Sequence, residues 1–244
     1  MYHWQVTRED LPGYIRSRLK ESGTVRGREA IQRFFKEPVE AYGVSAKQVK
    51  ELERELWPQV KGWPPADRNW LCTELLKSGT IEEGILAAYL YRRFAKSCGA
   101  CEFRLFDRWI DRYVRNWAHC DGICTSLVAA AIENEPQLIS QLPGWATSPN
   151  RWKRRAAAVS LVREARRGRH GREIFQIAGL LMEDNDEMVQ KGAGWLLKET
   201  YAHRPEQTVA FLRRWRSRTA RLVLRYAAEK MTPDDRLKVL EKTE

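Results

Sequence analysis

The stretch Arg154-Arg155-Ala156-Ala157 aligns with Gln190-Lys191-Gly192-Ala193 at an offset of 36 residues, and this spacing determines the fold that we expect. Asp121-Gly122 lies 34 residues before Arg155-Ala156, and Arg221 lies 30 residues after Lys191. Two helices in every 30 to 40 residues are typical of HEAT-like and armadillo-like repeats. The spacing therefore predicts an all-α helical-repeat solenoid, in which these positions line a concave and mostly basic face.

Helical periodicity extends through most of the remaining chain. Ser45 is a candidate N-cap for a helix that runs to about Gln59. Thr80-Ile81-Glu82-Glu83 fits a capping box, followed by a helix with apolar residues as far as Phe94. Further amphipathic stretches predict helices at about 101–115, 117–133, 136–142, 150–166, 172–183, 186–202, 205–215, 218–230 and 233–241. The sequence contains no run of alternating apolar and polar residues that would predict a β-strand, and no sign of a domain boundary. We therefore expect a single HEAT-like repeat domain over residues 1–244, with about 1–25 as an N-terminal cap or arm.

The charge is concentrated in the C-terminal part of the chain. The 244 residues are 43% hydrophobic and 31% charged, which excludes a disordered chain and a membrane protein. The net charge is +11, and residues 147–225 alone hold 18 Lys and Arg against 8 Asp and Glu. Such a local surplus indicates a polyanionic partner, most often nucleic acid, although a basic surface without a partner is the alternative.

The N-terminus and the cysteines indicate the compartment. Because Met1–Gln5 begins no apolar segment and the apolar runs are too short to span a bilayer, we expect no signal peptide and no membrane segment. Five cysteines are too few for a disulfide scaffold, so we expect reduced thiols in the cytoplasm. Cys98, Cys101, Cys120 and Cys124 have an approximate zinc spacing, but their helical context favours packed thiols, and we predict no metal.

Two tryptophan positions are candidates for chemistry. Trp117 and Asp121 are four residues apart, so on a helix they share one face. A carboxylate beside a flat aromatic ring can stabilise positive charge; the alternative is an acid that complements a helix dipole, with Trp117 in the core. In Lys191-Gly192-Ala193-Gly194-Trp195, the mid-helix glycines indicate that a packed helix or a ligand approaches the backbone. Trp195 lies one turn after Lys191 and shares its face.

Two basic segments are candidates for phosphate contact. Arg151–Arg155 places four cations, including Lys153, Arg154 and Arg155, at a predicted helix start, where backbone N–H groups also favour anions. Arg166–Arg172 is predicted to be a flexible basic loop that contacts a nucleic-acid backbone through Arg166, Arg167, Arg169 and Arg172. In both segments, a solvated charge run without a ligand is the alternative.

Four motifs in the same order resemble those of the AlkD-like DNA alkylation-repair glycosylases, a family of HEAT-like repeat proteins. The resemblance covers about Arg33 to Arg225. Its motifs are Arg33-Phe-Phe-Lys followed by Ala41-Tyr-Gly-Val-Ser-Ala, Trp117-x3-Asp121, Trp152-x2-Arg155-Ala-Ala, and Gln190-Lys-Gly-Ala-Gly-Trp195.

The resemblance implies a monofunctional DNA N-glycosylase that releases cationic N3- and N7-alkylpurines from duplex DNA without drawing the base into a pocket. It places the catalytic groups at Asp121, Trp117 and Trp195, and a phosphate-binding arginine at Arg155. The basic residues named above, with Lys191 and Arg221, are expected to bind the DNA backbone. We further expect a monomer that needs no cofactor and associates with the nucleoid of a bacterial-type cell when bound to DNA.

Two other functions are compatible with a basic helical-repeat protein. A non-catalytic protein that binds damaged or branched DNA would share the basic face and keep one or two of the tryptophans. A protein-binding scaffold would present an apolar or acidic groove instead. The presence of Trp117, Asp121, Arg155 and Trp195 together favours the glycosylase.

Overall fold

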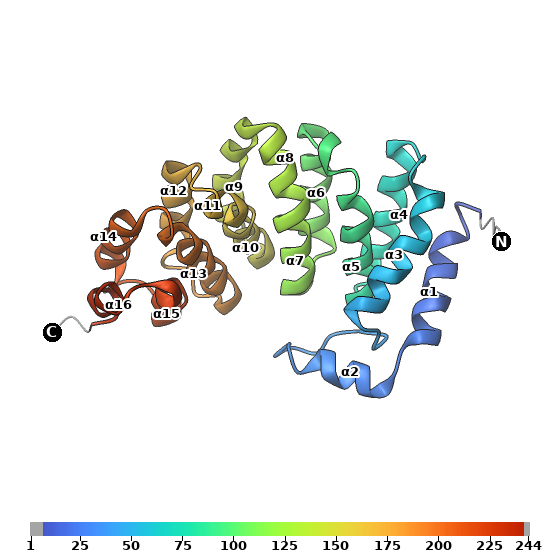
Figure 1. The fold of residues 1–244 in the computed structure, drawn as a ribbon, viewed down its shortest axis with the longest axis horizontal. Coiled ribbons are helices and arrows are strands. Elements are labelled where there is room, and N and C mark those ends of the chain that lie inside the picture. Colours follow the sequence, from blue (N-terminus) through green and yellow to red (C-terminus); the bar gives the residue numbers. More distant parts are fainter. Residues whose placement is uncertain (1–6, 242–244) are drawn as a thin grey trace. The chain divides into compact units, whose positions relative to one another are not determined.

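The computed structural model describes residues 7–241, which are helical without a strand in this range (Figure 1). The all-α prediction is therefore confirmed. Contacts divide the chain into two compact units. Unit 1 contains the residues up to Lys96 together with Arg112–Gly122, and unit 2 contains Ser97–Asp111 together with the residues from Ile123 onward. Among the described residues, no helix is both long enough and apolar enough to cross a membrane.

Unit 1 is built around helix α5, Ile81–Arg92, most of whose residues are buried. Contacts join α5 to α3, Ala46–Val60, and to α4, Pro65–Lys77, and α4 also contacts α1, Leu11–Ser22. The predicted N-cap at Ser45 is confirmed: its hydroxyl accepts the Gln48 N–H, and the Gln48 side chain accepts the Ser45 N–H. The remaining elements of this unit are α2, Val25–Gln32, and α7, Trp117–Ile123, except for its last residue.

The prediction of a capping box at Thr80 was wrong, although α5 does begin directly after Thr80. The Thr80 side chain makes no capping hydrogen bond. Glu83, which a capping box requires at the third helical position, instead accepts a hydrogen bond from Tyr42 Oη at 2.6 Å and pairs with Arg16 Nε at 3.2 Å. This carboxylate therefore joins α5 to distant segments and does not close its own helix terminus.

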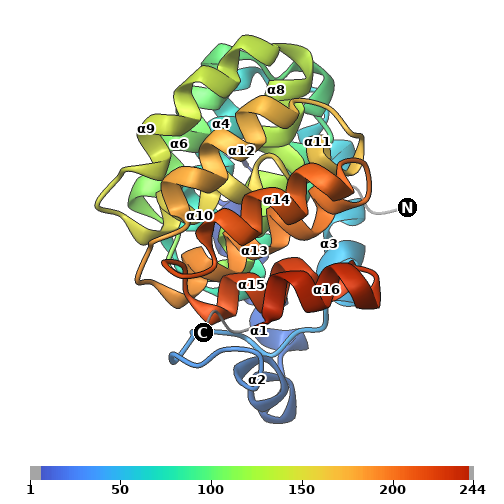
Figure 2. The ribbon, with the colours of Figure 1, turned by 90° about the vertical axis from the view of Figure 1, so that its left-hand side faces the viewer.

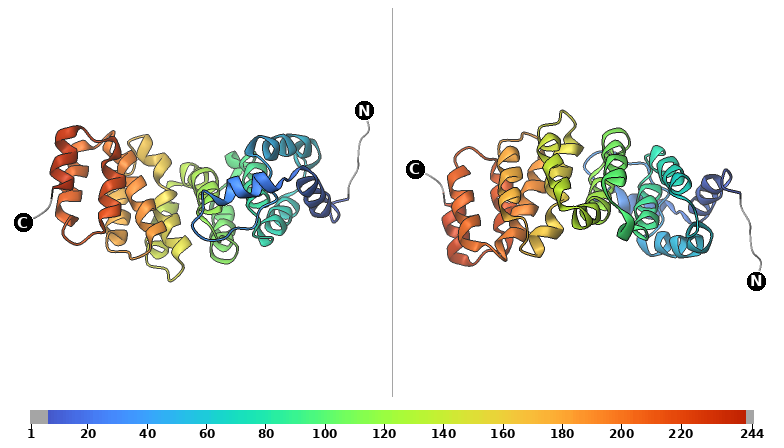
Figure 3. Two further views of the ribbon diagram at one scale, coloured as in Figure 1. Left: turned by 90° about the horizontal axis from the view of Figure 1, so that it is seen from below. Right: turned by 90° about the horizontal axis from the view of Figure 1, so that it is seen from above.

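Unit 2 repeats a helix-pair arrangement along the sequence. The pairs are α9 with α10 (Leu142–Ala146 and Arg151–Val159), α12 with α13 (Gly171–Leu181 and Glu187–Tyr201), and α14 with α15 (Pro205–Trp215 and Arg221–Ala227). Contacts link α10 to α13 and α13 to α15, so the second helices form one layer (Figures 2 and 3). This succession confirms the predicted helical repeat within unit 2.

Glycines in α13 allow neighbouring helices to pack closely in this layer. A Cβ atom at position 192 would lie 3.3 Å from Arg155 Cγ, and one at position 194 would lie 2.5 Å from Tyr226 Cβ. Real Cβ atoms essentially never approach another heavy atom as closely as at position 194, so Gly194 is required for the contact between α13 and α15. The close approach expected at these glycines is therefore made by packed helices on both sides.

Several predicted helix bounds differ from the structure. The helix expected at 117–133 is α7, a π-helical segment Cys124–Val128 and α8, Ala129–Asn134. The stretch 136–142 is mainly a 3-10 helix, Pro136–Gln141, and 150–166 is α10 followed by α11, Val162–Arg166. The other predicted stretches contain α6, Ala100–Arg112, and the C-terminal elements Ala228–Lys230 (3-10) and α16, Pro233–Leu240.

Helices α2 and α4 were not identified from the sequence pattern. Helix α1 lies within the stretch 1–25 that was expected to be an N-terminal cap or arm. Part of the expected N-terminal cap or arm is thus helical, and its residues 1–6 lie outside the described residues. The sequence does contain the signals that predict α4. Pro65 occupies the first turn, and the apolar residues Leu71, Cys72, Leu75 and Leu76 follow with helical spacing.

Candidate functional site

Trp117 is the first residue of α7 and is half-buried. Its ring stacks on Phe35, with the ring centroids 5.1 Å apart and an interplanar angle of 22°. Phe35 lies in the turn after α2, so two segments that are far apart in sequence meet at this tryptophan. One side of the indole is thereby fixed by stacking, which orients the ring that the sequence singled out.

Asp121 lies one helical turn after Trp117 and is half-buried, as is the adjacent Gly122. His119 lies between the tryptophan and the aspartate and points into the core: only 2% of it is exposed. Its Nε2 lies 3.2 Å from the Ile81 carbonyl oxygen, and its Nδ1 lies 3.3 Å from Asn116 Nδ2. Because His119 and Asp121 are two positions apart on α7, their side chains point to different sides of the helix.

Burial lowers the pKa of His119 to about 4, and this effect outweighs the hydrogen bonds to backbone carbonyls, which act in the opposite direction. The imidazole is therefore neutral at pH 7. Gly84 makes room for it, because a Cβ at that position would overlap the His119 ring. The ring thus fixes α7 against α5 and supplies no proton at the surface that carries Asp121.

Two buried carboxylates that the sequence analysis did not select hold the neighbouring backbone in place. Glu82 accepts the backbone N–H groups of Tyr42, Gly43 and Val44 at 3.0, 2.7 and 2.9 Å, and Glu83 binds Tyr42 Oη. Gly43 has a φ of +88°, a conformation that favours glycine. The sequence signal for these two residues was a pair of acids at the start of an otherwise apolar helix. Because acids are rarely buried without partners, such a pair predicts carboxylates that bind other parts of the chain.

A second cluster surrounds Trp195 in unit 2. The Trp195 indole donates from Nε1 to Glu199 Oε1 at 3.2 Å, and the Arg166 guanidinium carbon lies 5.8 Å from the centre of the indole ring. Arg166 and Lys230 also pair with Glu199, at 3.2 and 2.8 Å. Burial alone would raise the pKa of Glu199, but the hydrogen bonds from Arg166 and Lys230 prevail and hold it at about 2. Glu199 thus fixes the edge of the Trp195 ring.

Replacing Glu199 by Gln is expected to lower the melting temperature by roughly 4 to 8 °C at pH 7. Glu199 is buried while Arg166 and Lys230 are more than half exposed, so solvent screens part of the interaction. Removing the buried charge then costs about 2 kcal/mol, and each kcal/mol corresponds to about 2–4 °C at this size. The folded-state pKa is lowered, so the stabilisation is present above about pH 4.5 and is lost as the pH falls toward about 2. The difference between wild type and variant should shrink across that range.

Circular dichroism melts of both proteins from pH 7 to pH 2 measure this effect. The matched control is Glu229→Gln, because Glu229 pairs with Lys198 but is largely exposed, and exposed pairs contribute about 0–1 kcal/mol. An equal loss of stability in the two variants, or a difference between Glu199→Gln and wild type that does not depend on pH, would contradict the role assigned to Glu199.

Arg155 is buried in the structure, with 5% of the residue exposed. Its Nη1 donates to the Met188 carbonyl oxygen at 2.5 Å, and its aliphatic part packs on Gly192. It therefore joins α10 to α13. Its neighbours are also engaged: Lys153 pairs with Asp107 at 2.8 Å, and Arg154 pairs with Asp184 at 2.6 Å and donates to two backbone carbonyls.

The basic segment 166–172 is an ordered turn and not an unattached loop. Arg166 ends α11, and Arg172 lies in the first turn of α12. Arg167 pairs with Glu133, and Arg169 pairs with the buried Glu164 at 2.8 Å. The expectation of a flexible basic loop was therefore wrong, because Glu133 of α8 and Glu164 of α11 bind the arginines between the two helices.

The remaining candidate phosphate-binding residues are Lys191, Arg172 and Arg221. Lys191 is half-exposed and pairs within its own helix with Glu187 at 2.7 Å. Arg172 and Arg221 are exposed, and their side chains form no hydrogen bond or ion pair with any residue in the range 7–241. These two arginines are available to a phosphate without the loss of an internal ion pair.

Arg221→Gln and Arg172→Gln are each expected to reduce the slope of log affinity for duplex DNA against log salt concentration by about one unit, because each removes one phosphate contact and its counterion release. Fluorescence anisotropy with an unmodified duplex over a series of salt concentrations measures the slope. The matched control is Arg108→Gln on α6, an exposed arginine outside the candidate set. Slopes that match wild type in both variants would remove these residues from the interface.

The cysteines are thiols in packed positions, with one exception. Cys72, Cys98, Cys120 and Cys124 are buried, Cys101 is exposed, and all five are free. Burial raises the pKa of Cys72 to about 12. Within residues 7–241, no group of three or more His, Cys, Asp or Glu side chains is arranged to hold a metal ion.

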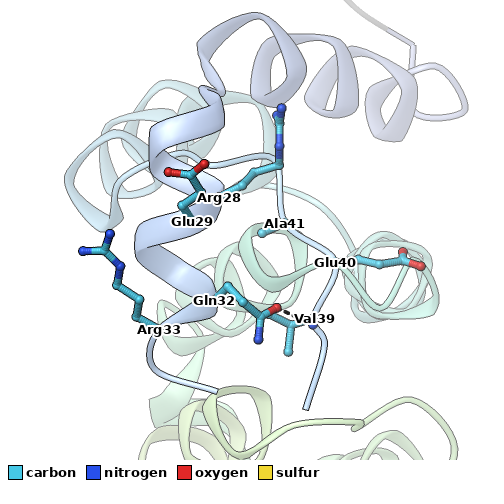
Figure 4. Close-up of a pocket in the computed structure, with 7 residues that line it drawn as sticks. All are labelled: Arg28, Glu29, Gln32, Arg33, Val39, Glu40 and Ala41. Carbon is cyan, nitrogen blue, oxygen red and sulfur yellow. Dashed lines mark hydrogen bonds between the residues drawn. The ribbon is translucent and has the colours of Figure 1, made fainter. Parts of the chain in front are cut away.

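A surface cavity of about 660 Å³ lies between α2 and the chain that returns from it (Figure 4). Two arginines and two glutamates contribute to its lining, together with Gln32, Val39 and Ala41; the charged residues are Arg28, Glu29, Arg33 and Glu40. The cavity therefore lies on the same segment of unit 1 that carries Phe35, the stacking partner of Trp117.

The candidate residues are divided between the two units. Trp117 and Asp121 lie together on α7 in unit 1. Trp195 and Arg155 lie in unit 2, where Trp195 is joined to Arg166 through Glu199. Each unit thus presents one of the two tryptophans, with an acid four residues after it in the same helix.

Comparison with known proteins gives a family match and a similar fold. The sequence model of a family described as DNA alkylation repair enzyme matches residues 15–231. A solved structure described as a predicted DNA alkylation repair enzyme from Enterococcus faecalis has a TM-score of 0.77 and 13% sequence identity; the match covers 87% of this chain and 98% of that one. No curated protein matches the sequence significantly. The family match spans the segments that carry both tryptophans.

Proposed function

The chain belongs to the DNA alkylation repair enzyme family, and we propose that within it the protein acts as a monofunctional DNA N-glycosylase. Its substrates would be cationic N3- and N7-alkylated purines in duplex DNA. The observation that carries the proposal is the surface of α7, where the half-exposed Asp121 follows one turn after a Trp117 that is fixed by stacking on Phe35.

The chemistry of alkylated purines suits these groups. Alkylation at N3 or N7 places a positive charge on the base and weakens the bond between the base and C1′ of the sugar. As this bond breaks, its electrons neutralise the base and the sugar becomes an oxocarbenium-like cation. The Asp121 carboxylate would stabilise that cation and orient the water that attacks C1′, taking up its proton directly or through solvent. The bond that forms is C1′–O, and the bond that breaks is C1′–N.

Each tryptophan would offer an aromatic face to the DNA. An indole face attracts positive charge, so it favours the transition state over the neutral sugar of the ground state. Trp117 is supported by Phe35, and Trp195 is supported at its indole N–H by Glu199. Because the reacting sugar would be held at half-exposed side chains, the base would not need to enter a pocket, in contrast to most glycosylases.

The proposed catalytic groups are a carboxylate and two indoles, none of which can form a Schiff base with the sugar. The enzyme would therefore leave an abasic site without cutting the strand. The basic residues of unit 2 would bind the duplex. Arg172 and Arg221 are the best-supported candidates, because both are exposed and neither forms an ion pair with another residue in the range 7–241. Arg155 would contribute by fixing α10 against α13, with its guanidinium bound to Met188.

Incubation of the protein with a duplex that carries one N7-methylguanine tests the proposal. Free base detected by chromatography, with the strand uncut until alkali is added, supports a monofunctional glycosylase. DNA binding without release indicates a non-catalytic protein that binds damaged or branched DNA, and the absence of both indicates a scaffold. A duplex with unmodified guanine at the same position is the control.

A further inference from the structure

Phe34 is an apolar side chain that the fold leaves almost uncovered. It follows α2 directly, and 74% of it is exposed. The next residue, Phe35, turns the other way and stacks on Trp117. Two consecutive aromatic residues therefore have opposite environments, and the exposed one is a single residue from the support of the proposed catalytic tryptophan.

The turn that presents Phe34 is held by several hydrogen bonds. The Gln32 side chain donates to the carbonyl oxygens of Phe35 and Glu37, at 3.1 and 3.0 Å. It also accepts the Val39 N–H at 3.1 Å, as Figure 4 shows. The Phe34 N–H also donates to the Ile31 carbonyl oxygen at 3.0 Å. Because the backbone on both sides is fixed, the outward position of the ring is built into the turn.

The charges around Phe34 indicate the kind of surface that it meets. Residues 25–40 contain four basic side chains, Arg26, Arg28, Arg33 and Lys36, against three acids, Glu29, Glu37 and Glu40, and the basic ones lie before Phe34 or within two residues of it. None of the eight residues of α2 is buried, so the helix presents its cations to solvent. An aromatic ring among arginines suits nucleic acid, whose phosphates pair with the cations while a base stacks on the ring. A groove in a protein partner would have to bury the same cations.

We propose that Phe34 stacks on a base of the duplex beside the damaged nucleotide and opens that base step. This inference rests on the proposed function, because it assigns to Phe34 the task of making the sugar accessible to Trp117 and Asp121. Insertion of an apolar side chain between bases unstacks them, and the ring replaces the lost stacking contact. Phe34 is thus a positioning residue, separate from the groups that act on C1′.

The test compares Phe34→Ala and Phe34→Trp with wild type in two assays. In the first, single-turnover release of N7-methylguanine should be about tenfold slower in Phe34→Ala, since loss of one stacked base costs about this much or more. Phe34→Trp should restore most of the rate. In the second, a 2-aminopurine beside the lesion should brighten when wild type binds, because it unstacks, and this signal should be lost in Phe34→Ala.

Val25→Ala is the matched control, because Val25 is 63% exposed on α2, the helix before the Phe34 turn, and is also apolar. It should match wild type in both assays, and the salt dependence of binding should be unchanged in all variants. If Phe34→Ala matches wild type in both assays, the inference is overturned and the proposed function stands. If wild type releases no base, the proposed function fails, and the 2-aminopurine signal alone decides: its loss in Phe34→Ala supports stacking, and its persistence overturns it.

Discussion

Asp121→Asn is expected to slow the release of N7-methylguanine by roughly 100-fold or more while duplex affinity stays within about twofold of wild type. The carboxylate acts on a charge that develops only in the transition state, and removal of one such electrostatic group costs about this factor. The substitution keeps the size and shape of the side chain on α7. Single-turnover kinetics give the rate, and fluorescence anisotropy with the same duplex gives the affinity.

The control for this experiment is Asp234→Asn, which neutralises an exposed aspartate in the first turn of α16. Its rate and affinity should match those of wild type. If Asp121→Asn loses affinity and rate by the same factor, the carboxylate contributes to binding and not to the chemical step. If the variant keeps the full rate, Asp121 has no part in the reaction.

The enzyme is expected to accelerate the release of cationic bases more than the release of neutral ones. After correction for the rates at which the two kinds of base are lost without enzyme, the preference should be roughly 10² to 10⁴-fold. This is the range that a general acid contributes to catalysis, and a neutral base needs such an acid. His119 is buried and neutral, with a pKa lowered by burial to about 4, so it supplies no proton to a leaving base. A base can then leave only by its own positive charge. N3-methyladenine and N7-methylguanine should be released, whereas uracil, hypoxanthine and 1,N6-ethenoadenine should remain in the strand.

Single-turnover release from matched duplexes, each with one of these lesions, measures the difference. The rate for N7-methylguanine should also be flat between about pH 5.5 and 8, because His119 would titrate only near pH 4. Efficient excision of any neutral base would show that a general acid exists, and the mechanism would have to be replaced.

The helical fold was predictable because it depends on local spacing. The N-cap at Ser45 placed α3 to within a residue at both ends, and the offset of 36 residues between Arg155 and Lys191 corresponds to the spacing of α10 and α13. The glycine at position 192 correctly indicated a close approach. What approaches is the Arg155 side chain, which the spacing alone could not identify.

The partners of the charged residues were not predictable, because they lie on other helices. Arg154 meets Asp184 thirty residues later, and Arg166 meets Glu199 thirty-three residues later. A pattern of basic residues along one helix cannot show that the next repeat supplies matching acids. For the same reason, the stacking of Phe35 on Trp117 and the burial of Glu82 and Glu83 required the tertiary structure.

The mass of the treated strand tests the central claim, which is hydrolysis of the glycosidic bond, most directly. A duplex with a single N7-methylguanine is incubated with excess protein, and both strands are analysed by mass spectrometry beside the Asp121→Asn reaction. We expect a strand that has lost the whole methylated base and gained a hydroxyl group at C1′, uncut, with little of this product from the variant. A strand with restored guanine, or one that keeps its methylated base although the protein binds it, would contradict the proposal.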